Sequence, residues 1–300
     1  MKGFLMDLPV PCPEEHPDVR AAGEAVRAAR EQGLLPPAYL DFRLRVLEIS
    51  RGRVAVPLAG APVAAVLSKT DAERSLREGI PLFPASAYRA GAFPAALAGI
   101  ARAMEAGGVE GGASLAGALG KSGKDRPDLD ALARAVMTRD TRALEEAAKK
   151  IGISASLLRF AVSGALFPDL SPVAEAMKPL LRNDLWMRGY CPVCGAEPGA
   201  GTLRREPEGA RALHCSACGA SWRFKRIACP FCGNEAHGEM EALSSDFRPS
   251  RRVSACRRCR RYLKETDERK LPEGAEIRPA AEDIVTLDLD LEAENRGYRN

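Results

Sequence analysis

The sequence predicts an α+β protein of two domains, in which an all-helical N-terminal domain precedes two tandem metal-binding modules with small antiparallel β-hairpins. Eight of the nine cysteines lie between residues 191 and 259, in four CxxC turns. The first 185 residues contain one cysteine, Cys12, and show helical periodicity between Pro and Gly residues. Beyond residue 185 the chain changes to short β-branched or aromatic runs between turns.

Four segments follow from this change in composition. With 300 residues the chain is long enough for a sizeable core and for more than one domain. We expect a helical domain over residues 1–185, a first four-cysteine module over 186–227 and a second over 228–272. The tail, residues 273–300, should pack back on the modules.

The N-terminal half contains seven segments with a helical apolar pattern. They are residues 18–31, 38–50, 85–106, 129–137, 141–151, 156–166 and 172–181. The Gly-rich run over 107–123 reads as a mobile interhelical loop. It includes "GKS" at Gly120–Ser122, but a phosphate-binding loop needs a glycine where Leu115 stands and a strand before it.

No export signal or membrane span is expected. The N-terminus "MKGFLMDLPVPCPEEHP" lacks a continuous apolar core, and the apolar stretch 54–67 is short and contains Pro57 and Pro62. These features favour a cytoplasmic protein. In a reducing cytosol, paired cysteines are more often metal ligands or redox groups than structural disulfides.

The CxxC turns predict two tetrathiolate metal sites. Each turn delivers two sulfurs to one ion, so two turns complete a tetrahedron. The gaps between turns are twenty, ten and twenty-three residues, and each long gap fits a hairpin. Sequential pairing is therefore preferred over a cross-braced arrangement of turns one with three and two with four. It gives site 1 (Cys191, Cys194, Cys215 and Cys218) and site 2 (Cys229, Cys232, Cys256 and Cys259).

The residue after each turn carries a second signal. Gly195, Gly219 and Gly233 follow three of the turns, where a positive φ lets backbone N–H groups point at the sulfurs. Arg260 follows the fourth turn, where the same left-handed conformation would cost on the order of 1 kcal/mol. The last half of site 2 is thus expected to be looser.

The role and identity of the two ions stay open at this point. Four-cysteine sites are mostly structural, although electron transfer or redox sensing is the alternative, and both zinc and iron accept four sulfurs. His214 and His237 are minor alternatives as ligands, and Cys12 with His16 is too sparse for a site. No catalytic Ser, His and Asp arrangement is recognisable, which favours a protein that is not an enzyme.

Basic clusters in the cysteine-rich half suggest nucleic acid but do not require it. Residues 186–270 hold an excess of seven positive side chains, and eight thiolates with two divalent ions reduce this to about +3. Trp222 and Phe224 alternate with Arg223 and Lys225, so the aromatic rings should face the core rather than bases. A zinc-ribbon nucleic-acid binder is therefore an alternative and not the preferred function.

Four motifs resemble the formate dehydrogenase accessory protein family, FdhE. They are "YCPVCGAEPGAG" (190–201), "RALHCSACGASWRFKRIACPFCG" (211–233), "CRRCRRYLK" (256–264) and "DIVTLDLDLEAENRGYR" (283–299). Over residues 1–185 the resemblance is only to a helical domain of similar length. The family has glycine where this chain has Arg260.

The resemblance implies a cytoplasmic maturation chaperone that is required for active formate dehydrogenase. The implied partner is the large catalytic subunit, bound before export. The implied modules are rubredoxin-like, with two metal ions that are iron or zinc. A rubredoxin-like electron carrier is a further alternative, because such sites can be redox-active.

Overall fold

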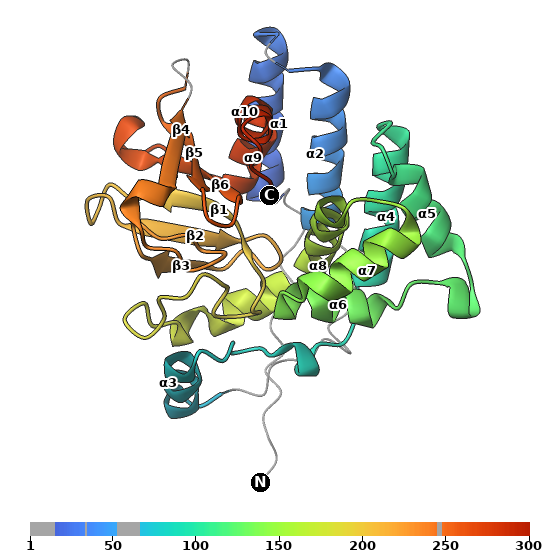
Figure 1. Ribbon diagram of the computed structural model, residues 1–300, viewed down its shortest axis with the longest axis horizontal. Helices are drawn as coiled ribbons and strands as arrows, with labels where there is room; N and C mark the ends of the chain where they lie inside the picture. The colour runs from blue at the N-terminus through green and yellow to red at the C-terminus, as the bar shows by residue number, and fades with distance from the viewer. Residues whose placement is uncertain (1–15, 34, 53–66, 245–247) are drawn as a thin grey trace.

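The computed structural model describes residues 16–33, 35–52, 67–244 and 248–300, and shows a bundle of helices packed against one mixed sheet (Figure 1). The helices of the N-terminal half are α1 (Pro17–Glu31), α2 (Pro37–Arg51), α3 (Lys69–Glu78), α4 (Phe93–Ala106), α5 (Gly112–Gly120), α6 (Leu129–Thr138), α7 (Thr141–Ile151) and α8 (Ala155–Met177). The strands are β1 (Pro198–Leu203), β2 (Arg211–Cys215), β3 (Ser221–Phe224), β4 (Met240–Ser244), β5 (Arg251–Cys256) and β6 (Tyr262–Asp267). Two C-terminal helices follow, α9 (Pro279–Ile284) and α10 (Leu287–Asn295).

The helix starts follow local sequence chemistry. The side chains of Ser68, Asp128, Asp140 and Ser154 each accept a hydrogen bond from a backbone N–H three residues on, at the N-termini of α3, α6, α7 and α8. Such caps satisfy N–H groups that have no partner within the helix. The predicted helices over 18–31, 38–50, 129–137 and 141–151 agree with α1, α2, α6 and α7 to within a residue or two.

The prediction of two helices over 156–166 and 172–181 is wrong. One helix, α8, continues from Ala155 to Met177 through Pro168 and Pro172. Asp169, which lies between the prolines, accepts hydrogen bonds from Tyr88 Oη at 2.8 Å and from the backbone N–H of Ala92 at 2.6 Å. These hydrogen bonds, and the packing of α8 against α2, α4, α6 and α7, offset the backbone hydrogen bonds that the prolines remove.

Three more features of the helical half differ from expectation. The Gly-rich run 107–123 is not simply a loop, because it contains α5 with Leu115 fully buried. The helix expected over 85–106 begins at Phe93, after a short 3-10 turn at Ala85–Ala87. Helix α3 was not predicted. Cys12 lies outside the described residues, as does the apolar stretch 54–67 except for Leu67.

The strands form one six-stranded sheet in the order β3-β2-β1-β6-β5-β4. Each half is an antiparallel three-stranded unit, β1-β2-β3 or β4-β5-β6. Strands β1 and β6 join the halves as a parallel pair, with Gly201 opposite Glu265. The predicted class, helices followed by antiparallel hairpins, is confirmed, but the fusion of the two modules into one sheet was not predicted.

A buried ion pair crosses the join between the halves. Arg211 on β2 and Glu265 on β6 lie on either side of β1, with Arg211 Nε 2.5 Å from Glu265 Oε1 and both side chains almost fully buried. The pair is held by charge and not by an aligned hydrogen bond. Arg211 Nη1 also donates to the carbonyl of Ala228 at 2.6 Å, and Arg252 on β5 donates to Glu265 at 2.8 Å. Gly201 of β1 lies between the two charged residues, and its lack of a side chain leaves room for that of Glu265. A Cβ at this position would lie 3.1 Å from the Glu265 side chain.

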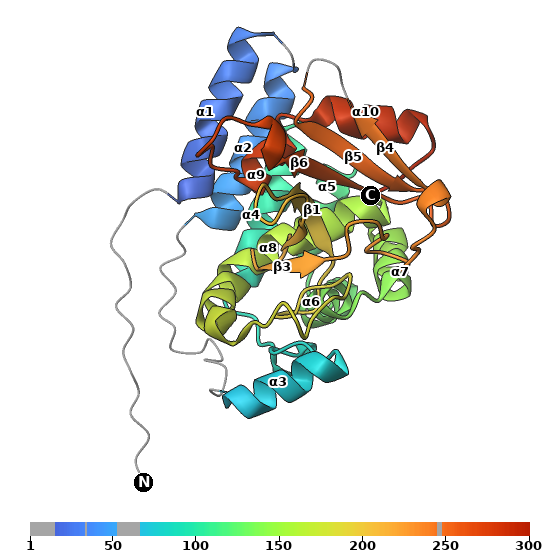
Figure 2. The ribbon, with the colours of Figure 1, turned by 90° about the vertical axis from the view of Figure 1, so that its left-hand side faces the viewer.

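The C-terminal helices clamp the sheet to the helical hairpin α1–α2. Helix α9 packs against α1, α2, β1 and β6, and α10 covers β4, β5 and β6 (Figure 2). Between them Lys264 of β6 lies 2.6 Å from the carboxylates of both Asp283 and Asp290, and Arg43 of α2 pairs with Asp283. One charge network thus ties α2, β6 and both C-terminal helices together.

The independence of the four expected segments as domains stays a prediction. The largest apolar core combines residues of α4, α6 and α8 with Cys191, Val193 and Leu213 of the cysteine-rich half. Among the described helices, none alone is long and apolar enough to cross a membrane, and residues 141–151 with 155–180 pass such a test only as a pair bent by 104°.

Glu265→Gln should destabilise the protein strongly, because it leaves Arg211 charged and buried without a counter-ion. Breaking a buried pair from one side costs about 3–5 kcal/mol. Glu235→Gln is the matched control, since the exposed pair of Glu235 with Lys225 contributes at most about 1 kcal/mol. Urea unfolding of both variants measures the difference, and equal losses would contradict the role given to the buried pair.

Asp283→Asn should destabilise the protein less at low pH than at neutral pH. Burial raises the pKa of Asp283, but Lys264 and Arg43 outweigh it and hold the pKa below its usual value. This stabilisation is present above the unfolded-state pKa of about 3.9 and disappears as the pH falls below it. The free-energy gap between wild type and variant should therefore narrow as the pH is lowered, as followed by urea unfolding. A constant gap would contradict the ionised state of Asp283.

Candidate metal centres

The four CxxC turns have the same backbone geometry. In each turn the N–H of the fifth residue donates to the carbonyl of the first cysteine, four residues before it, as in Gly195 to Cys191 at 3.0 Å and Arg260 to Cys256 at 2.9 Å. The N–H of the first cysteine in turn donates to the carbonyl of the sixth residue, as in Cys191 to Ala196 at 2.9 Å. The repeated sequence pattern therefore encodes one repeated turn.

The fifth residue of each turn has a positive φ, which the sequence indicated for the three glycines. The values are +81° at Gly195, +77° at Gly219 and +71° at Gly233, and Arg260 adopts +57° without being glycine. The Arg260 side chain lies over the ring of Tyr298 at 4.2 Å and donates to the carbonyl of Gly297 at 3.3 Å. These contacts with the C-terminal segment offset part of the strain at this position.

The structure brings the eight cysteines together in two groups of four. The sulfurs of Cys191, Cys194, Cys215 and Cys218 lie within 4.8 Å of one another, and so do those of Cys229, Cys232, Cys256 and Cys259. The groups are the sequential ones and not the cross-braced ones. None of the eight forms a disulfide.

The donor sets fit a tetrahedral metal ion. The sulfurs of Cys191 and Cys218 are 3.5 Å apart and those of Cys232 and Cys256 are 3.7 Å apart. Bonds of about 2.3 Å to one central ion would place tetrahedral sulfurs about 3.8 Å apart. Burial raises the pKa of the Cys256 thiol, but the N–H groups of Cys259 and Arg258 directed at its sulfur outweigh this and hold the pKa below its usual value. Either set could hold zinc or iron, which would organise the turns around it.

Site 1 is embedded in the core that it shares with the helical half. Its four cysteines are at most 4% exposed. The N–H groups of Leu82 and Phe83 donate to the carbonyls of Pro192 and Val193 at 2.9 and 2.8 Å. The first turn is therefore hydrogen-bonded to the segment that connects α3 to α4. Arg139, after α6, donates to the carbonyl of Gly195 at 2.5 Å.

Site 2 lies at the surface. Cys229 and Cys256 are buried, whereas Cys259 is partly exposed and Cys232 is exposed. Asn234 donates from Nδ2 to Glu239 at 2.8 Å and approaches the sulfur of Cys256 at 3.6 Å. Asn234 was not anticipated from the sequence, because an asparagine after Gly233 has no pattern that separates it from a turn residue.

The histidines do not join either group. His214 lies on β2, with Nε2 2.8 Å from Oγ1 of Thr202, and burial lowers its pKa to about 4, so that it is neutral at pH 7. His237 is exposed in a 3-10 turn. His16 accepts a hydrogen bond from the N–H of Asp18 and caps α1. In the described structure, none of the three histidines belongs to a four-cysteine group.

The two aromatic side chains of β3 face inward. Trp222 and Phe224 are 3% and 6% exposed, and Trp222 Nε1 donates to the carbonyl of Arg188 at 2.9 Å. These rings are therefore not available to stack on bases, which agrees with the alternation along β3.

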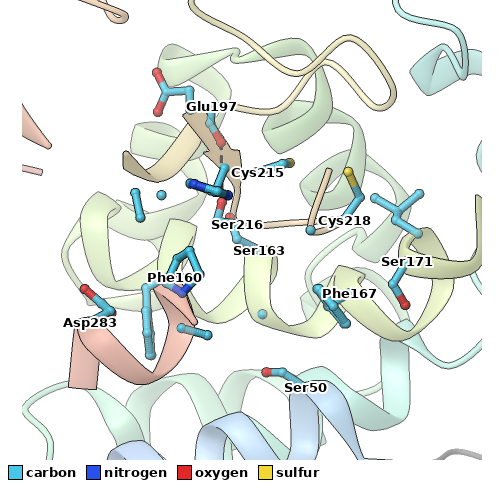
Figure 3. A pocket seen from close by; sticks show the side chains of 18 of the residues that line it. Ser50, Phe160, Ser163, Phe167, Ser171, Glu197, Cys215, Ser216, Cys218 and Asp283 are labelled. Carbon is cyan, nitrogen blue, oxygen red and sulfur yellow. Dashed lines mark hydrogen bonds between the residues drawn. The ribbon is translucent and has the colours of Figure 1, made fainter. Parts of the chain in front are cut away.

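A cleft of about 1400 Å³ lies between the helical half and the sheet, beside site 1. Cys215 and Cys218 line it from the sheet side, and Phe160, Ser163 and Phe167 line it from α8 (Figure 3). Several of its charged groups are paired across elements. The pairs are Arg51 with Asp18 at 3.2 Å, Arg261 with Glu197 at 2.6 Å, and Arg43 with Asp283.

Comparisons with known proteins agree with this architecture. A family model described as the FdhE central domain matches residues 190–226, which contain all of site 1. A "Protein FdhE homolog" from Aquifex aeolicus is 34% identical over 149 residues, 49% of this chain and 51% of the relative. One from Haemophilus influenzae is 33% identical over 110 residues, 36% of this chain and 35% of the relative.

The resemblance to the FdhE family is confirmed. The alignments span about half the length of these curated relatives or less. The crystal structure of the FdhE protein from Pseudomonas aeruginosa superposes with a TM-score of 0.56 and covers 94% of this chain and 92% of that chain. At 23% identity, this similarity shows that the FdhE fold extends over the N-terminal half as well.

Gly195→Ala should destabilise the protein more than Gly233→Ala. Both glycines have similar positive φ, so the left-handed strain of about 1 kcal/mol is matched. A Cβ at Gly195 would lie 2.5 Å from the Met137 carbonyl oxygen, whereas at Gly233 it would meet nothing within 4 Å. The excess loss should be about 1–3 kcal/mol in urea unfolding of the metal-loaded protein. Equal losses would contradict the docking of site 1 on α6.

Proposed function

We propose that this protein is an accessory factor required for active formate dehydrogenase, and that it binds the catalytic subunit of that enzyme in the cytoplasm before export. The observation that carries the proposal is the FdhE central-domain match over residues 190–226, whose four cysteines lie in one group. The proposal extends the family resemblance to a partner and a compartment.

We further propose that sites 1 and 2 each bind one ion, iron or zinc, through their eight cysteines. The sulfur separations and the N–H groups directed at sulfur support metal binding. Metal binding can contribute roughly 10 kcal/mol or more to the folding of such modules. At site 1 the ion would stabilise the turn on which the helical half packs.

The cleft between the helical half and the sheet supports a role in binding a protein. It combines the apolar rings of Phe160 and Phe167 with paired charges at its walls. A surface of mixed apolar and charged groups suits recognition of an unfinished partner. The proposed role is non-catalytic, and recognition at this cleft requires no chemistry of the chain's own.

A rubredoxin-like electron carrier is the second candidate function, and the exposure of Cys232 favours it. An iron site with a ligand residue at the surface could exchange electrons with another protein. Metal analysis and absorption spectra of protein purified without oxygen distinguish the candidates. Iron with a reversible visible absorbance change supports the carrier, and two zinc ions reject it.

Deletion of the gene in its own host should abolish formate dehydrogenase activity while leaving transcription of the enzyme intact. Wild-type protein should restore activity and co-purify with the catalytic subunit. Cys215→Ser in site 1 and Cys229→Ser in site 2 should not restore it, since each removes a sulfur from a four-cysteine group. Cys12→Ser is the control, because Cys12 belongs to neither CxxC group. Normal enzyme activity in the deletion strain would refute the function.

A further inference from the structure

We propose that the two metal sites are functionally unequal: site 1 is a closed structural centre, and site 2 is an open centre that exchanges its ion with thiol-seeking cations and chelators through Cys232 and Cys259. The inference rests on the proposed binding of an ion at each site. It assigns a separate activity, metal exchange, to one of them.

The exposure of the sulfur-bearing residues is the first observation. Cys191, Cys194, Cys215 and Cys218 of site 1 are 0%, 1%, 4% and 2% exposed. In site 2 one cysteine of each turn is buried and the other reaches the surface, namely Cys232 in the third turn and Cys259 in the fourth. An incoming ligand can therefore reach two adjacent donors of site 2 without any opening of the fold.

The surroundings of the turns are the second observation. A Cβ at Gly195 or Gly219 would lie 2.5 Å from the Met137 carbonyl oxygen or 3.1 Å from the Phe167 ring, so protein atoms pack against both turns of site 1. Cys215 and Cys218 border the cleft as well, but they are only 4% and 2% exposed. A Cβ at Gly233 would meet nothing within 4 Å. Release of an ion from site 1 requires the separation of these packed elements, and release from site 2 does not.

The anchoring of site 2 is the third observation. The buried pair of donors stays in place during exchange, because Cys256 ends β5 and its sulfur lies 3.6 Å from Nδ2 of Asn234. The Arg260 side chain lies over the Tyr298 ring at 4.2 Å and donates to the carbonyl of Gly297 at 3.3 Å, which attaches the fourth turn to the C-terminal segment. The exposed donors thus sit on turns whose buried halves are fixed. The exchange is a substitution of ligands in which no electrons are transferred.

Metal release from the purified full-length chain tests the proposal. The Cys12→Ser protein is loaded with two equivalents of Zn²⁺ and mixed with excess of the chromophoric chelator 4-(2-pyridylazo)resorcinol. One equivalent should leave at least about tenfold faster than the other, since only site 1 needs a local opening. Alkylation with iodoacetamide during the fast phase, followed by peptide mass mapping, should modify Cys232 and Cys259 first.

Serine variants of one cysteine from each site show which site produces the fast phase of zinc release and which produces the slow phase. Cys232→Ser should remove the fast phase and leave one slowly released ion in a folded protein, whereas Cys194→Ser should perturb the slow phase and the folding of the chain. Equal release rates, or earlier alkylation of the site 1 cysteines, would overturn the inequality while leaving metal binding intact. Failure of the chain to bind zinc or iron at all would instead reject the proposed metal sites themselves.

Discussion

The packing of the first CxxC turn against the helical half is the contact on which the rest of the structure depends. The carbonyls of Pro192 and Val193 accept hydrogen bonds from Leu82 and Phe83, and Gly195 lies against the end of α6. Site 1 is therefore both the centre of the first hairpin unit and part of the main apolar core. An ion bound at this position would couple metal binding to the packing of helices that contain no ligand.

The sheet extends this coupling to site 2. Its two halves meet at the parallel pair β1–β6, and the buried charges of Arg211 and Glu265 cross that junction. Such a buried pair adds little to the free energy of unfolding, because the cost of removing both charges from water opposes their attraction. Its main effect is to favour the one alignment of the two halves in which both charges are paired. Gly201 makes the crossing feasible by leaving out a side chain. The open site 2 is thus attached to the rigid site 1 through a fixed register.

The C-terminal helices complete the enclosure and form one wall of the cleft. Lys264, Asp283 and Arg43 join β6, α9 and α2, so the last part of the chain contacts one of the first helices. Each charge in this network has a partner from another element, which restricts how the helical hairpin and the sheet are arranged. The cleft beside site 1 therefore has walls from both halves of the chain.

The amino-acid pattern alone predicts the α+β class, the CxxC turns, the hairpin arms, the positive φ at the three glycines that follow turns, and the two sets of four cysteines. These features depend on residues within one turn or one hairpin unit. The folded chain is needed to see that α8 continues through Pro168 and Pro172, that the modules share one sheet, and that site 1 is buried while site 2 reaches the surface. Those outcomes depend on contacts such as Asp169 with Tyr88 and Met137 with Gly195, which join residues far apart along the chain. Burial and long-range pairing are properties of the assembled core, and no short-range pattern of residues encodes them.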